Sequence, residues 1–141
     1  MKIFLKIEHK RFSCNLLDIK RIILIFAVKT LITRLVSEEK RAKIISLIRD
    51  TIREAEPTAQ IILYGSRARG DAREDSDWDV LAIVDKPRLS LSDRSRLQYP
   101  VWDKGLDMGE EINVFSYTRK QWEQAPPSLF KHNVMSEGIT L

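Results

Sequence analysis

The sequence predicts an α/β (α+β) fold, a small mixed β-sheet flanked by helices, and three observations lead to it. Residues 61–64 and 78–85 are short apolar runs rich in β-branched side chains, which is typical of buried strands. Residues 111–117 alternate apolar and polar side chains, which indicates a third strand with two different faces. Segments with helical periodicity lie around these runs, so helices are expected to cover the sheet.

A long amphipathic helix is predicted ahead of the first strand. It begins at Ser37, a residue type that commonly caps helices, and it carries two glutamates in its first turn. Apolar residues then recur at helical spacing, and the helix must end before Pro57.

Three further helices are expected in the second half of the chain. One is interrupted or begun near Pro100, after the polar stretch that follows the second strand. Residues 118–124 form a short helix stopped by two prolines, and residues 128–138 form a last helix with Gly138 at its C-cap.

The positive charge of the chain is concentrated at its N-terminal end. The 141 residues suit one domain and have a net charge of +4 with a pI of about 9.3. Residues 1–36 hold eight Lys/Arg against two acidic residues, which gives +6, and residues 37–141 hold sixteen basic against eighteen acidic residues, which gives −2. The main body, residues 37–141, therefore has no overall footprint for nucleic acid, although a local patch stays open.

Residues 1–36 form a basic extension that has two interpretations: an arm that docks on another molecule, or a translated upstream segment outside the natural protein. The apolar run 22–28 is too short to span a bilayer, and no small-x-small cleavage site follows it, which disfavours a signal peptide. Cys14 is the only cysteine, so no internal disulfide and no cysteine-based zinc cluster exist. We expect a cytoplasmic protein with no membrane association.

A possible anion-binding turn follows the first strand. Gly65 and Ser66 come directly after residues 61–64, and a short helical run begins there. Glycine lets a phosphate approach the backbone, and N–H groups at a helix start point toward an anion. The alternative is a tight turn with a capping serine, and the spacing of Gly65 and Gly70 fits neither a P-loop nor a dinucleotide fingerprint.

Two aspartates stand at the start of the second strand. Asp77 and Asp79 are two residues apart, so in a strand both carboxylates project from the same face. Such a pair repels unless a cation lies between them, and carboxylate oxygens together with substrate phosphates suit Mg²⁺. In the alternative, Asp77 is a loop residue and Asp79 pairs with an arginine of the preceding loop, Arg67, Arg69 or Arg73.

Together these residues resemble the DNA polymerase β-like nucleotidyltransferase superfamily, and most closely its minimal (MNT) branch. The resemblance covers the main body and is carried by a G-S-x-A-x-G run followed by S-D-x-D in a strand: Gly65, Ser66, Ala68, Gly70, Ser76, Asp77 and Asp79. It implies a polymerase β-like fold, two Mg²⁺ ions held by three carboxylates, and attack of a hydroxyl on the α-phosphate of ATP with loss of pyrophosphate. It also implies nucleotide binding by Gly65, Ser66 and Gly70, with Arg67 and Arg69 as candidates for the triphosphate.

The third carboxylate is where the chain departs from the family pattern. In many relatives an aspartate stands nine residues before the aromatic residue of the following helix, and here that position is Asn113. Glu111 lies two residues earlier on the same expected strand face and is the candidate for the third metal ligand and catalytic acid. The alternatives are an inactive site, or a carboxylate from the loop such as Asp107 or Glu110.

The size of the main body directs the functional interpretation. It leaves no room for an acceptor-binding domain, so a partner is expected to supply the acceptor. The resemblance is then to the antitoxin half of HEPN/MNT pairs, which implies transfer of AMP from ATP to a hydroxyl of a HEPN-type toxin. The alternative is a catalytically weak or inactive module that neutralises a partner by binding, and a small-molecule (antibiotic) nucleotidyltransferase is a third reading. The base preference, the acceptor and the oligomeric state stay open.

Overall fold

The structure, a computed structural model, describes residues 16–141. Cys14, His9 and the first part of the basic extension lie outside the described residues. The elements, in chain order, are α1 (Leu16–Ala55), β1 (Gln60–Tyr64), α2 (Ser66–Arg69), β2 (Trp78–Val84), α3 (Leu91–Asp107), β3 (Ile112–Thr118), α4 (Arg119–Gln124), α5 (Leu129–Glu137) and β4 (Ile139–Thr140).

The described residues form one mixed sheet of four strands in the order β3-β2-β1-β4, which confirms the expected fold class. β2 runs parallel to β3 and antiparallel to β1, and the two-residue β4 pairs antiparallel with the other side of β1. β4 is not predictable from the sequence, because two residues are too few to show an alternating pattern.

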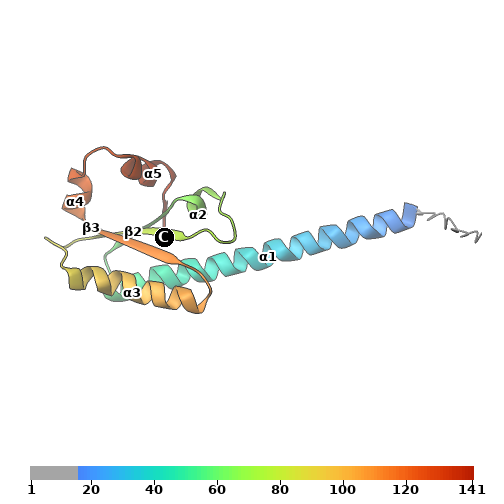
Figure 1. Cartoon of the computed structure of the whole chain (residues 1–141), viewed down its shortest axis with the longest axis horizontal. Coiled ribbons are helices and arrows are strands. Elements are labelled where there is room, and N and C mark those ends of the chain that lie inside the picture. The colour runs from blue at the N-terminus through green and yellow to red at the C-terminus, as the bar shows by residue number, and fades with distance from the viewer. Residues whose placement is uncertain (1–15) are drawn as a thin grey trace, which may run out of the picture. The chain divides into compact units, whose positions relative to one another are not determined.

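Helices cover both faces of the sheet (Figure 1). On one face, the C-terminal part of α1 and α3 pack on β1, β2 and β3 in a buried cluster that includes Ile48, Leu97 and Val80. On the other face, Val134 of α5 packs against Leu81 and other strand residues, with aromatic side chains around them. Alternate residues of β2 therefore enter opposite layers, as period-two geometry requires.

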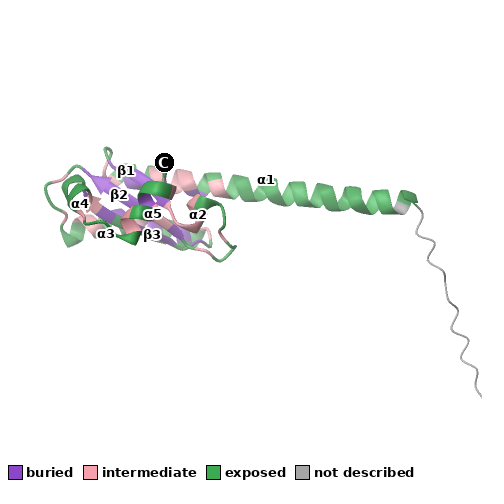
Figure 2. Cartoon of the chain, turned by 90° about the horizontal axis from the view of Figure 1, so that it is seen from above, coloured by how far each residue is buried: buried purple, intermediate pink, exposed green. Residues whose placement is uncertain are grey.

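α1 begins far upstream of the expected start at Ser37. The Ser37 hydroxyl does not cap a helix end but donates to the carbonyl of Arg34 over 2.8 Å, one turn earlier in the same helix. The preceding residues include no glycine or proline that would stop a helix. In Figure 2 this part of α1 is exposed, and its side chains become buried near Arg41, where the compact unit Arg41–Leu141 begins. No helix within residues 16–141 has the length and apolar character that crossing a membrane requires.

α3 begins nine residues before Pro100 and runs through it. Its start is fixed by a capping box, because the Ser90 hydroxyl accepts from the amide of Asp93 over 3.1 Å and the Asp93 carboxylate accepts from the amide of Ser90 over 2.9 Å. Gly138 is the C-cap of α5, as expected.

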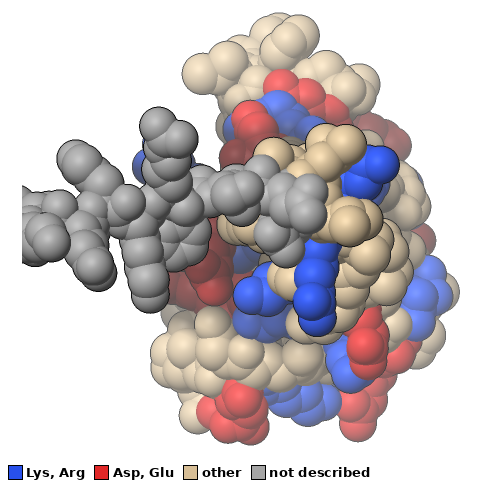
Figure 3. All heavy atoms as spheres, turned by 90° about the vertical axis from the view of Figure 1, so that its right-hand side faces the viewer, with Lys and Arg blue, Asp and Glu red and all other residues tan. Residues whose placement is uncertain are grey.

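Basic and acidic side chains are interspersed on the surface that Figure 3 shows. Residues 37–141 hold sixteen basic and eighteen acidic residues, so the main body has a near-balanced charge.

Candidate active site

Gly65 joins β1 to α2 in a conformation that side chains rarely adopt. Its φ of 74° and ψ of −158° turn the chain sharply, and its carbonyl accepts from the amides of Ala68 and Arg69 over 3.0 and 3.1 Å. Gly65, and not Ser66, is the N-cap of α2, so Ser66 is not the capping serine of the alternative interpretation. Within residues 16–141 the Ser66 hydroxyl makes no hydrogen bond.

Asp79 lies directly beside this turn. It pairs in register with Tyr64, the residue before Gly65, across the antiparallel β1–β2 ladder. A Cβ atom placed on Gly65 would come within 2.8 Å of the Asp79 Oδ2 atom. The turn therefore needs glycine for two reasons, its positive φ and the close approach of the carboxylate.

Asp77 and Asp79 form a like-charged pair without a basic partner. Burial, and secondly the charge of Asp77, raise the pKa of Asp79 above its ordinary value. No ion pair within the described part of the chain involves either aspartate, so the structure does not show the alternative pairing of Asp79 with Arg67, Arg69 or Arg73. Two neighbouring carboxylates without a basic partner fit a divalent cation, which would relieve their repulsion.

Arg67 belongs to a largely buried cluster of hydrogen-bonded groups beside the loop that joins α2 to β2. Its guanidinium donates to the backbone carbonyl of Ser76 over 2.7 Å, to that of Glu74 over 3.1 Å and to the Glu110 carboxylate over 3.2 Å. The indole Nε1 of Trp78 donates to the same Glu110 oxygen over 2.8 Å. Glu110 is 8% exposed and Arg67 16%, so this is a largely buried ion pair.

These bonds hold the residue that precedes Asp77. The Arg67 guanidinium also lies 5.0 Å from the centre of the Trp78 ring, and Arg41 of α1 donates to the Arg67 carbonyl over 2.8 Å. Arg67 therefore ties α1, α2 and the loop to the start of β2. The pairing of Arg67 with Glu110 is not predictable from the sequence, because the two residues are 43 positions apart and share no local pattern. Nucleotide binding by Arg67 stays a prediction.

Arg69 is paired at the surface. It donates to Asp71 over 3.1 Å and to Glu137 of α5 over 2.8 Å. Hydrogen bonds to Glu137 first and to Asp71 second raise the pKa of the guanidinium further. Gly70 ends α2 in a left-handed conformation, with φ of 84°. Nucleotide binding by Arg69 and Gly70 stays a prediction.

The third carboxylate is not gathered with the other two. Asn113 stands opposite Asp79 in the parallel β2–β3 register, and Glu111 precedes β3 with an exposed side chain. Among residues 16–141 no group of three or more His, Cys, Asp or Glu side chains lies close enough together to hold one ion. Of the loop alternatives, Glu110 is committed to Arg67 and Trp78, and Asp107 is exposed at the end of α3. The metal role of Glu111 stays a prediction.

A cluster of aromatic side chains packs on the face of the sheet that carries Leu81 and is covered by α5. Tyr64 meets Phe130 edge to face with ring centroids 5.4 Å apart, and Phe130 also lies 5.8 Å from Trp122. Burial, then the charge of Asp79, and then Tyr117 raise the pKa of Tyr64 well above its ordinary value. Tyr64 therefore stays a neutral phenol beside the acidic pair.

A family model described as nucleotidyltransferase domain matches residues 45–135. That match spans more than half of the chain and contains the glycine turn and both aspartates, and the chain belongs to this family. A comparison with curated proteins gives no significant match.

Several solved structures are similar to this chain. A structure described as a toxin–antitoxin with AMP-PNP is 20% identical, with a TM-score of 0.47 and 71% of this chain and 70% of that chain covered. A putative nucleotidyltransferase from Sulfolobus solfataricus is 18% identical, with a TM-score of 0.46 and 72% and 82% covered. A complex of a tri-AMPylated Shewanella oneidensis HEPN toxin with an MNT antitoxin is 16% identical, with a TM-score of 0.45 and 73% and 69% covered.

Proposed function

We propose that this chain is a Mg²⁺-dependent nucleotidyltransferase that moves AMP from ATP to a hydroxyl of a partner protein, a HEPN-type toxin, with release of pyrophosphate. The observation that carries the proposal is the unpaired Asp77–Asp79 pair beside the Gly65 turn. Membership of the nucleotidyltransferase domain family supports the reaction class.

Each residue has a stated role in this proposal. Asp77 and Asp79 would hold two Mg²⁺ ions, and the positive charge of a bound ion would offset the burial and the Asp77 charge that raise the pKa of Asp79. Gly65 and Ser66 would hold the triphosphate, Gly65 by letting a phosphate approach its backbone and Ser66 through its hydroxyl, which makes no hydrogen bond within residues 16–141. When bound, Mg²⁺ neutralises the charge that develops on the attacking and leaving oxygens.

The acceptor is a hydroxyl group of the partner protein. Its hydroxyl oxygen forms a bond to the α-phosphorus, the bond from that phosphorus to the pyrophosphate oxygen breaks, and the hydroxyl proton passes to a base, for which Glu111 is the candidate. A HEPN-type toxin is the partner to test first, because the motif from Gly65 to Asp79 resembles that of MNT antitoxins.

The test is the transfer of label from ATP labelled at the α-phosphate to purified HEPN-type toxins. We expect Mg²⁺-dependent labelling of a hydroxyl side chain by the full chain and none by the Asp77→Asn/Asp79→Asn variant. Asp75→Asn is the matched control, since Asp75 is an exposed acid of the same loop that makes no ion pair within residues 16–141, and it should label normally. Undiminished labelling by the double variant would refute the proposed role of the pair.

A second function is favoured by one observation, the Asn113 side chain at the position opposite Asp79. Asparagine carries no charge and takes up no proton, so the domain would neutralise its partner by binding alone. That function predicts a stable complex with the toxin that forms without ATP, stays unlabelled, and survives the Asp77→Asn/Asp79→Asn change. Labelling by the wild-type chain would exclude it.

A further inference from the structure

The first part of α1 leaves its large apolar side chains exposed (Figure 2). α1 is one continuous helix, and its residues 16–40 belong to a unit separate from the compact unit Arg41–Leu141. Every leucine, isoleucine, valine and phenylalanine from Leu16 to Val36 is at least 42% exposed. Exposed apolar surface on this scale marks an interaction site.

One side of this helix carries an apolar row with the spacing of a coiled coil. Residues that recur at alternating intervals of three and four lie along one side of a helix. The row has side chains that are 47–63% exposed, and it consists of Leu24, Val28, Leu31 and Leu35. The next positions of the same row are Arg21 at its N-terminal end and Glu38 at its C-terminal end, both exposed. We call the row from Arg21 to Glu38 the α1 seam.

The other sides of the segment also carry apolar residues, but in rows that polar residues interrupt. A row that begins with Ile22 and Ile25 meets Lys29 at its centre. A row that includes Ile23 and Phe26 continues with threonines at positions 30 and 33. The α1 seam is therefore the row best suited to pack against another helix, because knobs-into-holes packing needs apolar residues at successive positions.

The charged side chains of this segment argue against a lipid surface as its occupant. A helix that lies on a membrane has one polar side opposite its apolar side. Arg21, Lys29 and Arg34 instead point in three different directions, as their helical spacing requires. A second helix, which needs only one apolar row, fits this distribution better.

The α1 seam is complementary to a second copy of itself that runs in the opposite direction. A two-fold axis between Lys29 and Thr30 would set Leu24 opposite Leu35 of the second copy. The same register sets Val28 opposite Leu31 of the second copy, so the centre of the pair is apolar.

The ends of this antiparallel register are complementary in charge. Arg21 lies opposite Glu38 of the second copy, and the two-fold axis repeats that ion pair at the other end. A parallel pair in register would instead set Arg21 against Arg21 and Glu38 against Glu38, and like charges across a seam oppose pairing. The charges therefore select the antiparallel arrangement.

We propose that the α1 seam is a dimerisation surface, through which two copies of this chain pair antiparallel. The seam is about 25 Å long at the helical rise per residue. Its four apolar residues supply the attraction, and the Arg21–Glu38 pairs fix the direction and the register. The inference goes beyond the proposed function, because pairing needs neither ATP nor metal nor a toxin. Asp77→Asn/Asp79→Asn should therefore dimerise as the wild type does.

The test is sedimentation equilibrium of the full chain over about 1–100 μM, with a reducing agent to keep Cys14 from forming a disulfide. We expect a monomer–dimer equilibrium in which the dimer fraction rises with concentration. Leu24→Asp places a carboxylate in two apolar layers of the dimer and should weaken dimerisation at least about tenfold. Leu24 is exposed in the single chain, so the variant should keep its fold.

Ile23→Asp is the matched control on the same helix. Ile23 is 62% exposed and Leu24 is 63% exposed, but Ile23 lies outside the α1 seam. The control should dimerise as the wild type does, because its charge stays in water.

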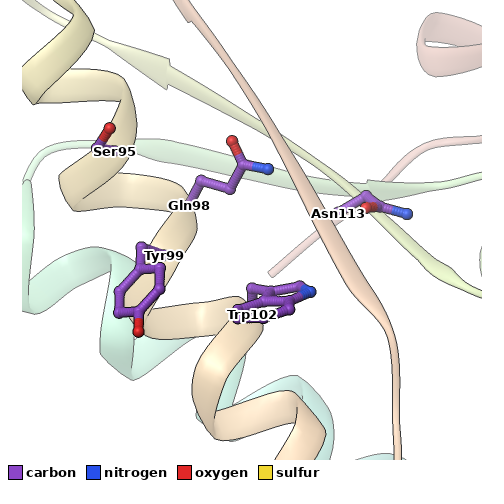
Figure 4. Close-up of a pocket in the computed structure, with 5 residues that line it drawn as sticks. All are labelled: Ser95, Gln98, Tyr99, Trp102 and Asn113. Carbon is purple, nitrogen blue, oxygen red and sulfur yellow. The ribbon is translucent and has the colours of Figure 1, made fainter.

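A second control lies in the compact unit, at the hollow between α3 and β3. The hollow has a volume of about 260 Å³, and Figure 4 shows Gln98 and Trp102 extending from α3 toward β3 at its wall. Tyr99 also lines it and is 61% exposed. Tyr99→Asp changes a large exposed ring outside the α1 seam and should leave dimerisation unchanged.

Charge reversal tests the direction of the pair. Arg21→Glu sets two acids against each other at both ends and should weaken dimerisation about fivefold. Arg21→Glu/Glu38→Arg exchanges the two charges, restores both ion pairs and should return the dimer to wild-type affinity. A parallel dimer would not respond in this way, because its like-charged pairs remain in both variants.

Four results would overturn the proposal. The chain stays monomeric at every concentration, Leu24→Asp leaves the dimer intact, either control weakens the dimer as much as Leu24→Asp does, or the charge exchange fails to restore it. A monomeric chain that sediments with phosphatidylglycerol vesicles would assign the exposed segment to a lipid surface instead.

Discussion

Glu110 and the pair Asp77–Asp79 lie near the starts of two parallel strands, but only Glu110 is paired with a basic side chain. Glu110 is buried and its carboxylate accepts hydrogen bonds from Arg67 and Trp78. Asp77 and Asp79 have no basic partner within residues 16–141, and Asp79 lies against the glycine turn. The charge of Glu110 is thus balanced by Arg67. The charges of Asp77 and Asp79, the proposed metal ligands, have no basic partner within residues 16–141.

The difference separates an acid with a structural role from two acids for which we propose a functional role. A buried carboxylate with two donors contributes to stability only while both bonds remain. A like-charged pair opposes folding and is retained when it binds something. The following predictions test this contrast.

The largest expected effect is on stability, from Glu110→Ala. Removing the carboxylate leaves the Trp78 indole and part of the Arg67 guanidinium without acceptors, and the free energy of unfolding should fall by about 3 kcal/mol. Urea denaturation measures it. Glu111→Ala is the neighbouring control, exposed in the structure, and should change stability by less than about 0.5 kcal/mol. Equal losses in the two variants would contradict a structural role for Glu110.

Gly65→Ala should impair both stability and nucleotide binding. The new Cβ would meet the Asp79 Oδ2 atom, and the positive φ disfavours alanine, so unfolding should become easier by about 1–2 kcal/mol. ATP affinity should fall at least about tenfold because Asp79 is displaced. Gly109→Ala is the control: its φ of 71° is similar, but its Cβ would meet nothing within 4 Å, so it should lose stability and keep ATP binding. Identical ATP affinity in both variants would contradict the close packing of turn and carboxylate.

Asn113→Asp should sharpen the contrast by adding a third acid opposite Asp79. We expect Mg²⁺ affinity, measured by calorimetry with ATP present, to rise by up to about tenfold, since affinity follows the number of charged ligands. The control for general charge is Ser95→Asp, which adds an acid at an exposed position of α3. It should leave the Mg²⁺ affinity unchanged. Weaker metal binding by Asn113→Asp would show that this position is not part of the metal site.

The smallest effect is a pH-dependent gain of stability in Asp79→Asn. Because the pKa of Asp79 is raised in the folded state, ionising it opposes folding, and the cost develops as the pH rises from the ordinary aspartate value of about 3.9 through the raised pKa. The variant should therefore be more stable than the wild type at neutral pH, and equal to it below that range. Thermal denaturation of the metal-free proteins across pH measures this, with Asp103→Asn of the exposed α3 surface as control. A loss of stability at neutral pH would contradict the uncompensated pair.

The sequence predicted the fold class, because short β-branched runs and helical periodicity are local signals. In the structure, period-two alternation puts Trp78 in the core and Asp79 on the other face, and the antiparallel ladder sets Asp79 opposite Tyr64. The Arg67–Glu110 pair was not predictable, because a contact across 43 positions leaves no periodic signal.

The start of α1 and the strand β4 were missed for different reasons. The segment before Ser37 mixes apolar residues with charged ones such as Lys20 and Lys29, so it shows no single apolar face, and Ser37 imitates a cap inside a continuous helix. β4 depends on its pairing with Ile62 and Leu63 and not on its own two residues.

The most direct test of the account is calorimetric titration of the full chain with ATP and Mg²⁺. It is run beside Asp77→Asn/Asp79→Asn and the loop control Asp75→Asn. The account predicts metal-dependent binding by the wild type and by Asp75→Asn, and none by the double variant. ATP binding that is unchanged in the double variant, or that needs no metal, would contradict the assignment of Asp77 and Asp79 as the metal-holding pair.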